Sequence, residues 1–431
     1  MLGIRYGIGY LGVALLTQVV VQWVTYFYAP PIERGMATLL PMALIGVAMV
    51  FGRIIDAISD PLVGVWSDNS RHKGGRRLPF IKYGMVPLAL SFMLVWIPMG
   101  STEAARFIYL SVVLSAFFFF YTVVVAPYLA LLPELAESNS ERTKLSAWQA
   151  GFNIVGLALA MVGSAWLIES FGFKTMGIVL GLVALLAFAI TAFTVQERRE
   201  QEVTEPESLW SSMKLTFQNK PFLYYLVSQL LLWFGFNMTM IAVPYVVTVL
   251  MVMDEGAVGL ILGVALVISV LCFPLIVSLS TRYGYKKTLI ITMTMQGLVL
   301  GALGFVGLWP GQIPVFWQGL ITVGLAGFPL AGFFIIPNAM LAELTDYDYV
   351  LTGKRREAIY FGVQGLILKS AIGLSSLILT FVLERYGFSV ANPLGVRISG
   401  PLAGFFVLVG VAVLLFYPQD TVTNRVKSIS A

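Results

Sequence analysis

Charged residues are scarce in this chain. Only 11% of its 431 residues are Asp, Glu, Lys or Arg, whereas 58% are hydrophobic. A soluble domain carries about 25% charged residues, so this chain has less than half the supply that a water-facing surface needs. We therefore expect a protein whose surroundings are mostly lipid.

Cysteine and histidine are almost absent. The one cysteine, Cys272, excludes an internal disulfide, and the one histidine, His72, excludes a Cys/His metal cluster. The phosphate-binding motif G-x-x-x-x-G-K-[ST] is missing, which argues against an ATP-driven pump. There is also no His-based triad, so an enzyme is disfavoured. We therefore expect no cofactor and no metal beyond a possible Na⁺. We also expect no nucleic-acid partner, because the basic loops lack interleaved aromatic residues.

Long apolar runs are what the chain has in abundance. A membrane-spanning helix needs about 20 apolar residues. The first run, 7–28, is too long for a signal-peptide core and has no small-residue cleavage site, so we expect a retained helix. An all-α membrane protein with twelve spanning helices is predicted, near 7–28, 38–66, 79–99, 106–132, 146–168, 175–195, 221–250, 257–279, 288–308, 314–342, 357–383 and 399–417.

The basic residues are unevenly distributed between the predicted loops. With both termini in the cytoplasm, 20 of the 27 Lys and Arg fall in inward segments and 5 in outward loops, while Arg53 and Lys369 lie within spans. Cytoplasmic loops of membrane proteins carry such an excess of positive charge. We therefore expect both termini in the cytoplasm of a multi-pass protein of the plasma (inner) membrane.

One long polar break divides the predicted helices into two sets of six. The basic loop after the second helix, a stretched version of G-x-x-x-D-R-x-G-R-K, recurs in part after the eighth, from Arg282 to Lys287. This duplication describes the major facilitator fold, whose solute site lies near the membrane midplane. The predicted parts are two six-helix bundles at 1–195 and 221–417, a cytoplasmic linker at 196–220 and a cytoplasmic tail at 418–431.

Arg53, Asp56 and Asp60 are charges within the predicted second helix. Their spacing of three and four residues places them on one helix face. A charge at the bilayer centre costs about 2.5–3.5 kcal/mol, so such residues usually have a function. Carboxylate oxygens suit Na⁺ or a proton, and Ser59 and Thr122 can complete an oxygen shell. The alternative is a structural ion-pair network with Arg53.

Lys369 is a lone lysine in the middle of the predicted eleventh helix. It needs a counter-ion, and the carboxylates of the second helix are the obvious partners. Such a lysine can release the carboxylates when a cation arrives, which would couple ion to solute. The alternative is that its long side chain snorkels to a membrane surface.

Uncharged polar side chains recur at helical spacing and could line a solute path. In lipid, such residues also hold helices together, so each one has this alternative role. The candidates for a solute cavity are Gln18, Gln22, Gln149, Asn153, Trp233, Asn237 and Gln364.

Charged clusters also lie at predicted cytoplasmic ends of helices. The acidic group at the end of the tenth helix precedes a run of three basic residues, which favours a salt-bridge gate over a binding site. The predicted gate residues are Asp68, Arg76, Arg77, Glu343, Asp346 and Arg355.

At these residues the chain resembles the glycoside–pentoside–hexuronide:cation symporters over nearly its whole length. The segment from Arg53 to Pro61 resembles the family motif R-x-x-D-A-[IF]-x-D-P, and Pro127 to Glu134 resembles P-Y-x-A-L-L-P-E. Three further matches follow in family order, at Glu141–Arg142–Thr143, Ala342 to Tyr347 and Gln364 to Lys369.

The resemblance implies roles for some of these residues. Asp56 and Asp60 correspond to the carboxylates of the family's Na⁺/H⁺ site, Thr122 to a further oxygen ligand, and Lys369 to the basic residue coupled to them. The family's sugar-binding positions differ: Ala14, Val125 and Leu129 replace carboxylates and a stacking ring, and Gln149 replaces an arginine.

The leading expectation is a secondary active transporter. It would couple Na⁺ or H⁺ to the symport of a small organic solute, a sugar or glycoside, by alternating access. Because the sugar-binding residues differ, a lysolipid or other amphiphile is the alternative cargo, and a non-transporting membrane receptor is a third hypothesis. The expected partners are the solute, a monovalent cation and membrane lipid, with the protein itself a monomer.

Overall fold

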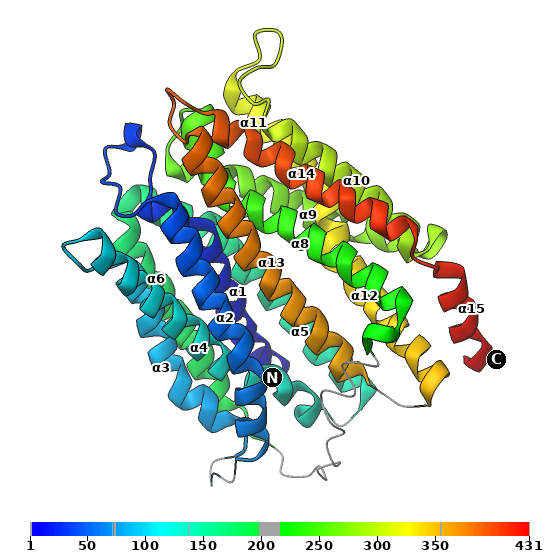
Figure 1. The fold of residues 1–431 in the computed structure, drawn as a ribbon. Coiled ribbons are helices and arrows are strands. Elements are labelled where there is room, and N and C mark those ends of the chain that lie inside the picture. Colours follow the sequence, from blue (N-terminus) through cyan, green and yellow to red (C-terminus); the bar gives the residue numbers. More distant parts are fainter. Residues whose placement is uncertain are drawn as a thin grey trace. The chain divides into compact units, whose positions relative to one another are not determined.

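The computed structural model describes residues 2–70, 72, 75–136, 138–197, 216–353 and 356–430. Within these residues the chain forms helices and no strands (Figure 1). It divides into two compact units. Unit 1 comprises Met1–Glu202, Val243–Leu260 and Ser376–Ala391, and unit 2 comprises Val203–Ala242, Ile261–Ser375 and Asn392–Ala431.

The helices follow one another with short connections. The first part of the chain forms α1 (Leu2–Tyr28), η1 (Ile32–Arg34), α2 (Met42–Asp68), α3 (Leu78–Val95), α4 (Glu103–Leu135), α5 (Asn139–Ala158), η2 (Leu159–Gly163) and α6 (Ser164–Thr194). The second part forms α8 (Lys220–Tyr245), η3 (Val246–Leu250), α9 (Glu255–Tyr283), α10 (Tyr285–Leu303), α11 (Val315–Leu325), α12 (Gly327–Thr352), α13 (Glu357–Tyr386), α14 (Leu394–Leu415) and α15 (Gln419–Ser430).

Ten helical stretches in the described residues are long and apolar enough to cross a membrane. One of them, Ser140–Thr194, contains Gly172 in a non-helical conformation (φ 79°, ψ 169°), and this break separates the predicted fifth and sixth spans. The short helix α10 is not among the ten, because Lys286 and Lys287 at its start lower its hydropathy. Each of the twelve predicted ranges thus overlaps a helix, which confirms the all-α membrane fold.

In unit 1, α1 packs against α5 and α6, and α2 packs against α4. Trp23 on α1 donates a hydrogen bond to Oγ of Ser164 at 2.8 Å. Near the start of α1, Tyr6 donates a hydrogen bond to the main-chain carbonyl of Tyr128 on α4 at 3.4 Å. Tyr128 in turn donates to the main-chain carbonyl of Tyr6 at 2.9 Å. These three buried side chains thus find hydrogen-bond partners on other helices, as polar groups in lipid need. This packing places one face of α2 against α4.

In unit 2, α10 packs against both α12 and α14, and α12 packs against α15. A Cβ on Gly404 of α14 would lie 2.3 Å from the carbonyl oxygen of Gly297 on α10, so only glycine allows this backbone contact. Tyr225 on α8 donates to the carbonyl of Pro337 on α12 at 2.8 Å. This bond parallels the one from Tyr6 to α4 in unit 1.

The predicted bundle boundaries at 1–195 and 221–417 stay a prediction. Most of the predicted linker, 198–215, lies outside the described residues. In the predicted tail, Gln419–Ser430 forms the helix α15.

Candidate functional site

The three charges of α2 share one face of the helix, as predicted. Nη1 of Arg53 donates to Oδ2 of Asp56 at 3.1 Å, and both side chains are buried, with 5% and 0% of their surface exposed. Asp60 lies one turn further along and is half-buried. A buried ion pair of this kind is costly to form and costly to break.

Thr122 on α4 joins the two carboxylates. Its hydroxyl lies 2.7 Å from Oδ1 of Asp56 and 3.2 Å from Oδ1 of Asp60. A hydroxyl has a single proton, so Thr122 can donate fully to only one carboxylate at a time. Three oxygen-bearing groups therefore meet at the α2–α4 contact, and such oxygens are the ligands that a hard cation takes.

Ser59 is buried beside this cluster, and its hydroxyl donates to the main-chain carbonyl of Asp56 at 3.0 Å. Its predicted part in the oxygen shell stays a prediction. Among the residues that the structure describes, no group of three or more His, Cys, Asp or Glu could hold a metal ion.

Lys369 lies half-buried on α13, in the part of that helix that belongs to unit 2. Its predicted coupling to the carboxylates of unit 1 stays a prediction. Gln364, five residues before it, is buried.

The predicted cavity residues of α1 stand out because their amides are unsatisfied. Gln22 is fully buried, and within the described part of the chain neither its Oε1 nor its Nε2 has a hydrogen-bond partner. Nε2 of Gln18, one turn earlier, is also buried and has no hydrogen-bond partner among the described residues. Gln149 and Asn153 on α5 are half-buried.

In unit 2 the predicted cavity residues of α8 have partners within their own unit. Asn237 donates to the main-chain carbonyl of Trp233 at 2.8 Å. The Trp233 ring lies 4.6 Å from that of Phe333, centroid to centroid. Gln229, earlier on α8, is fully buried, and both polar atoms of its amide lack hydrogen-bond partners in the portion of the chain that the structure describes.

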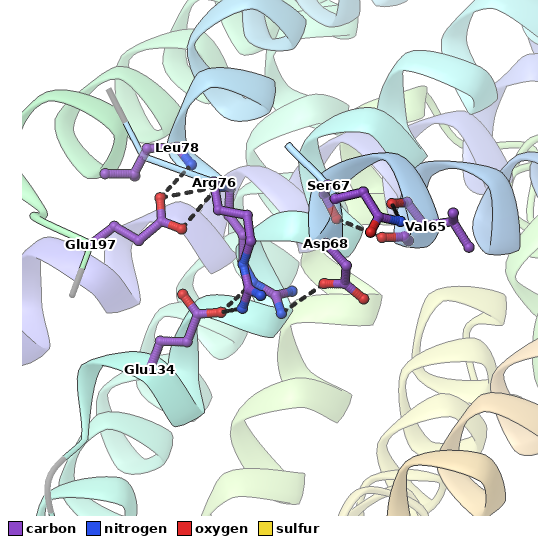
Figure 2. A network of polar contacts seen from close by, with 10 residues as sticks. Val65, Ser67, Asp68, Arg76, Leu78, Glu134 and Glu197 are labelled. Carbon is purple, nitrogen blue, oxygen red and sulfur yellow. Dashed lines mark hydrogen bonds and ion pairs between the residues drawn. The ribbon is translucent and has the colours of Figure 1, made fainter. Parts of the chain in front are cut away.

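The predicted gate residues of unit 1 form one network (Figure 2). Arg77 pairs with Asp68 at 2.9 Å, and Arg76 and Arg77 both bond to Oε1 of Glu134. Glu197 accepts hydrogen bonds from the main-chain N–H groups of Arg77 and of Leu78, and so caps the start of α3. The hydrogen bond to Glu134 raises the pKa of Arg76. Sequence reasoning missed Glu134 and Glu197 as partners.

The predicted gate residues of unit 2 are arranged differently. The buried pair is Arg356 with Asp348, at 2.8 Å. Glu343 instead accepts hydrogen bonds from Gln419 and Thr423 of α15, and Asp346 is exposed. Arg355 lies outside the described residues.

A further cluster in unit 1, which the sequence reasoning also missed, surrounds Glu255 at the start of α9. The carboxylate accepts hydrogen bonds from the hydroxyl of Tyr26 at 2.8 Å and from Nε of Arg34 at 3.0 Å. Arg34 also pairs with Asp254 at 2.9 Å. Burial lowers the pKa of Arg34, but the bonds to Glu255 and Asp254 outweigh this and raise it. The residues are over 200 positions apart, so no local pattern marks the pairing.

Comparisons with known proteins agree with this fold. A family model described as MFS/sugar transport protein matches residues 5–420. An uncharacterized symporter of Synechocystis, sll1374, is 24% identical and covers 96% of this chain and 93% of its own length. The isoprimeverose transporter of Lactiplantibacillus pentosus is 22% identical, and the match covers 89% of this chain and 82% of the transporter. The sodium-dependent lysophosphatidylcholine symporter 1 of Xenopus tropicalis is 21% identical, and the match covers 88% of this chain and 81% of the symporter.

A solved structure, that of the nucleoside transporter NupG, matches with a TM-score of 0.67. It is 14% identical and covers 96% of this chain and 98% of its own, so it shows the fold alone. The family match spans nearly the whole chain, and it identifies a transporter rather than an enzyme. This integral, multi-pass membrane protein therefore belongs to the MFS/sugar transport family, among the glycoside–pentoside–hexuronide:cation symporters of the major facilitator superfamily.

Proposed function

We propose that this protein couples the movement of Na⁺ or H⁺ to the symport of a small organic solute, in the first place a sugar or glycoside. The observation that carries the proposal is the contact of Thr122 with both Asp56 and Asp60. Symporter relatives and a family described as sugar transport support it.

The proposed cation site works through charge repulsion. Two carboxylates on successive turns of α2 repel each other, and the arginine beside them offsets only part of their charge. A Na⁺ ion or a proton between Asp56 and Asp60 removes the remaining repulsion. In this proposal Lys369 responds to the change in charge, and Ser59 supplies a further oxygen ligand.

The proposed solute contacts are the amides of α1. An unsatisfied buried amide costs about 1–3 kcal/mol per polar group. A carboxamide both donates and accepts hydrogen bonds, as a sugar hydroxyl does, so a hydroxyl-bearing solute can satisfy Gln18 and Gln22. Gln149, Asn153, Trp233, Asn237 and Gln364 complete the proposed solute path.

The proposed topology follows from the distribution of basic residues. Bundles at 1–195 and 221–417, joined by a linker at 196–220, would leave both termini in the cytoplasm of a plasma-membrane protein that acts as a monomer. The network of Asp68, Arg76 and Arg77 would then lie at the cytoplasmic side and act as a gate. Glu343, Asp346 and Arg355 stay proposed gate residues on the same side.

Uptake by vesicles that contain Asp60→Asn tests the cation site. The substitution removes one negative charge at nearly constant volume, so we expect gradient-driven accumulation to be lost while the purified protein stays folded. Asp254→Asn is a matched control, because it removes an exposed carboxylate far from Thr122 in the sequence. Full concentrative uptake by the Asp60→Asn variant would exclude the proposed site.

The cargo is tested by thermal stabilisation of the purified protein. Sugars, glycosides and lysolipids are added with and without Na⁺, and at two pH values. A ligand that binds the folded state raises the Tm, so ion-dependent stabilisation by a glycoside supports the leading proposal. Stabilisation by lysophospholipid alone would favour an amphiphile as cargo, which the Xenopus relative also favours.

A further inference from the structure

The guanidinium of Arg53 is held by few contacts for a buried charge. A guanidinium carries several N–H donors. Among the residues that the structure describes, Nε and Nη2 of Arg53 are buried without a hydrogen-bond partner, and Nη1 bonds to Asp56. The other contact is with an aromatic ring: the guanidinium carbon lies 4.1 Å from the ring centroid of Phe118 on α4. At this distance a cation is attracted to the face of a ring, most strongly where water is excluded.

Phe118 itself has little freedom to move. Its ring is fully buried, and it packs edge-on against Phe117 with the centroids 5.0 Å apart. The ring also lies close to Gly52 of α2, where an added Cβ would lie 2.6 Å from it. The glycine before Arg53 thus makes room for the ring that contacts Arg53.

One face of α4 contacts both the positive and the negative groups of the α2 cluster. Phe118 and Thr122 are four residues apart, so they share one face of α4. Phe118 contacts the positive group, Arg53, and Thr122 contacts the negative groups, Asp56 and Asp60. The ring therefore restrains a cationic side chain that lies within the candidate cation site.

A restrained arginine matters because it competes with the transported cation. If the guanidinium turned its unbonded N–H groups toward the carboxylates, it would occupy oxygens that Na⁺ or a proton needs. The observed single bond reaches Oδ2 of Asp56, whereas Thr122 contacts Oδ1.

We propose that Phe118 is a positioning residue that limits how strongly Arg53 competes with the coupling cation. The proposal rests on the proposed cation-coupled function. Loss of the ring face frees the guanidinium to pair more fully with the carboxylates, and the cation then binds more weakly. The affinity for the solute at saturating cation stays the same, because the ring acts only through Arg53.

The test is the half-saturating concentration of the coupling cation, Na⁺ at fixed pH or H⁺ by pH titration, in vesicle uptake. We expect Phe118→Leu to raise it roughly three- to tenfold, with the KM for solute at saturating cation unchanged. Phe118→Tyr keeps a ring face and restores the value to within about twofold. Phe117→Leu is the matched control, since it removes the neighbouring buried ring.

Each outcome either supports or overturns the proposed role of Phe118. An unchanged cation half-saturation in Phe118→Leu overturns the proposal, and so does an equal rise in Phe117→Leu, which would indicate general packing. If Phe118→Leu does not fold, Phe118→Met replaces it in the test. The proposal then requires that Phe118→Met raises the half-saturating cation concentration while Phe118→Tyr keeps it within about twofold. Uptake by the unsubstituted protein without any cation dependence would instead overturn the proposed function, and this inference with it.

Discussion

The hydroxyl of Thr122 on α4 lies 2.7 Å from Oδ1 of Asp56 on α2, and Asp56 is fully buried. This contact joins two helices at a carboxylate that also pairs with Arg53. A hydrogen bond to a charged group contributes about 1.5–3 kcal/mol. The contact therefore both stabilises the α2–α4 packing and orients an oxygen ligand of the proposed cation site.

Thr122→Val should weaken cation binding. The substitution keeps the shape of the side chain but removes the hydroxyl, which leaves the two carboxylates less well held and removes one ligand. We expect the half-saturating cation concentration in uptake to rise about tenfold, whereas Thr122→Ser, which keeps the hydroxyl, should stay within about threefold. Equal values for the valine and serine variants would show that the hydroxyl has no part in the site.

Glu134→Gln should lower thermal stability much more than Asp68→Asn. The side chain of Glu134 is 7% exposed and binds two arginines, whereas that of Asp68 is 56% exposed and binds one. Loss of one partner from a buried ion pair costs up to about 3–5 kcal/mol, and an exposed pair contributes about 0–1 kcal/mol. Since the arginines are partly exposed, we expect about 1–3 kcal/mol for Glu134→Gln.

The Tm values of both purified variants, measured in the same detergent, test this ranking. A larger loss of Tm for Asp68→Asn would contradict it.

Gln22→Leu should make the protein more stable and less able to bind its solute. Because both polar atoms of Gln22 are buried and unsatisfied, their removal gains about 1–3 kcal/mol in the absence of solute. A protein of this size should then gain a few degrees in Tm, roughly 2–4 °C or less. Asn237→Leu is the control, since its amide is already bonded to a main-chain carbonyl.

The measurement compares the Tm of the variants with and without the solute identified by the screen. If Gln22→Leu lowers Tm without solute and keeps full stabilisation by solute, Gln22 is a packing residue only.

The spanning helices could be predicted from the sequence because apolar runs of sufficient length must be helical in lipid, where each main-chain group needs an internal partner. Boundaries were harder to predict. The second helix was predicted to end at 66 but continues to Asp68, and the tenth was predicted to end at 342 but continues to Thr352. The polar residues at these ends extend the helix beyond its apolar part.

Part of the candidate site was also predictable. Arg53, Asp56 and Asp60 share one helix, so spacing alone places them on one face. Thr122 was predicted as a further oxygen ligand from its hydroxyl, and the resemblance to a family implied the same role. Phe118, by contrast, is one of four consecutive phenylalanines, and no pattern distinguishes the ring that contacts Arg53 from its neighbours.

By itself, the sequence determined that this chain spans a membrane and is helical. It also determined that the second helix carries three charges on one face, whose burial in lipid costs free energy. These follow from composition and from the geometry of a single helix. The tertiary structure alone showed that Thr122 contacts both carboxylates and that Phe118 contacts Arg53. It also showed that Glu134 and Glu197 bind the residues at the start of α3. The reason is that contacts between helices depend on the register in which two helices pack, and the local spacing of residues within either helix does not specify that register.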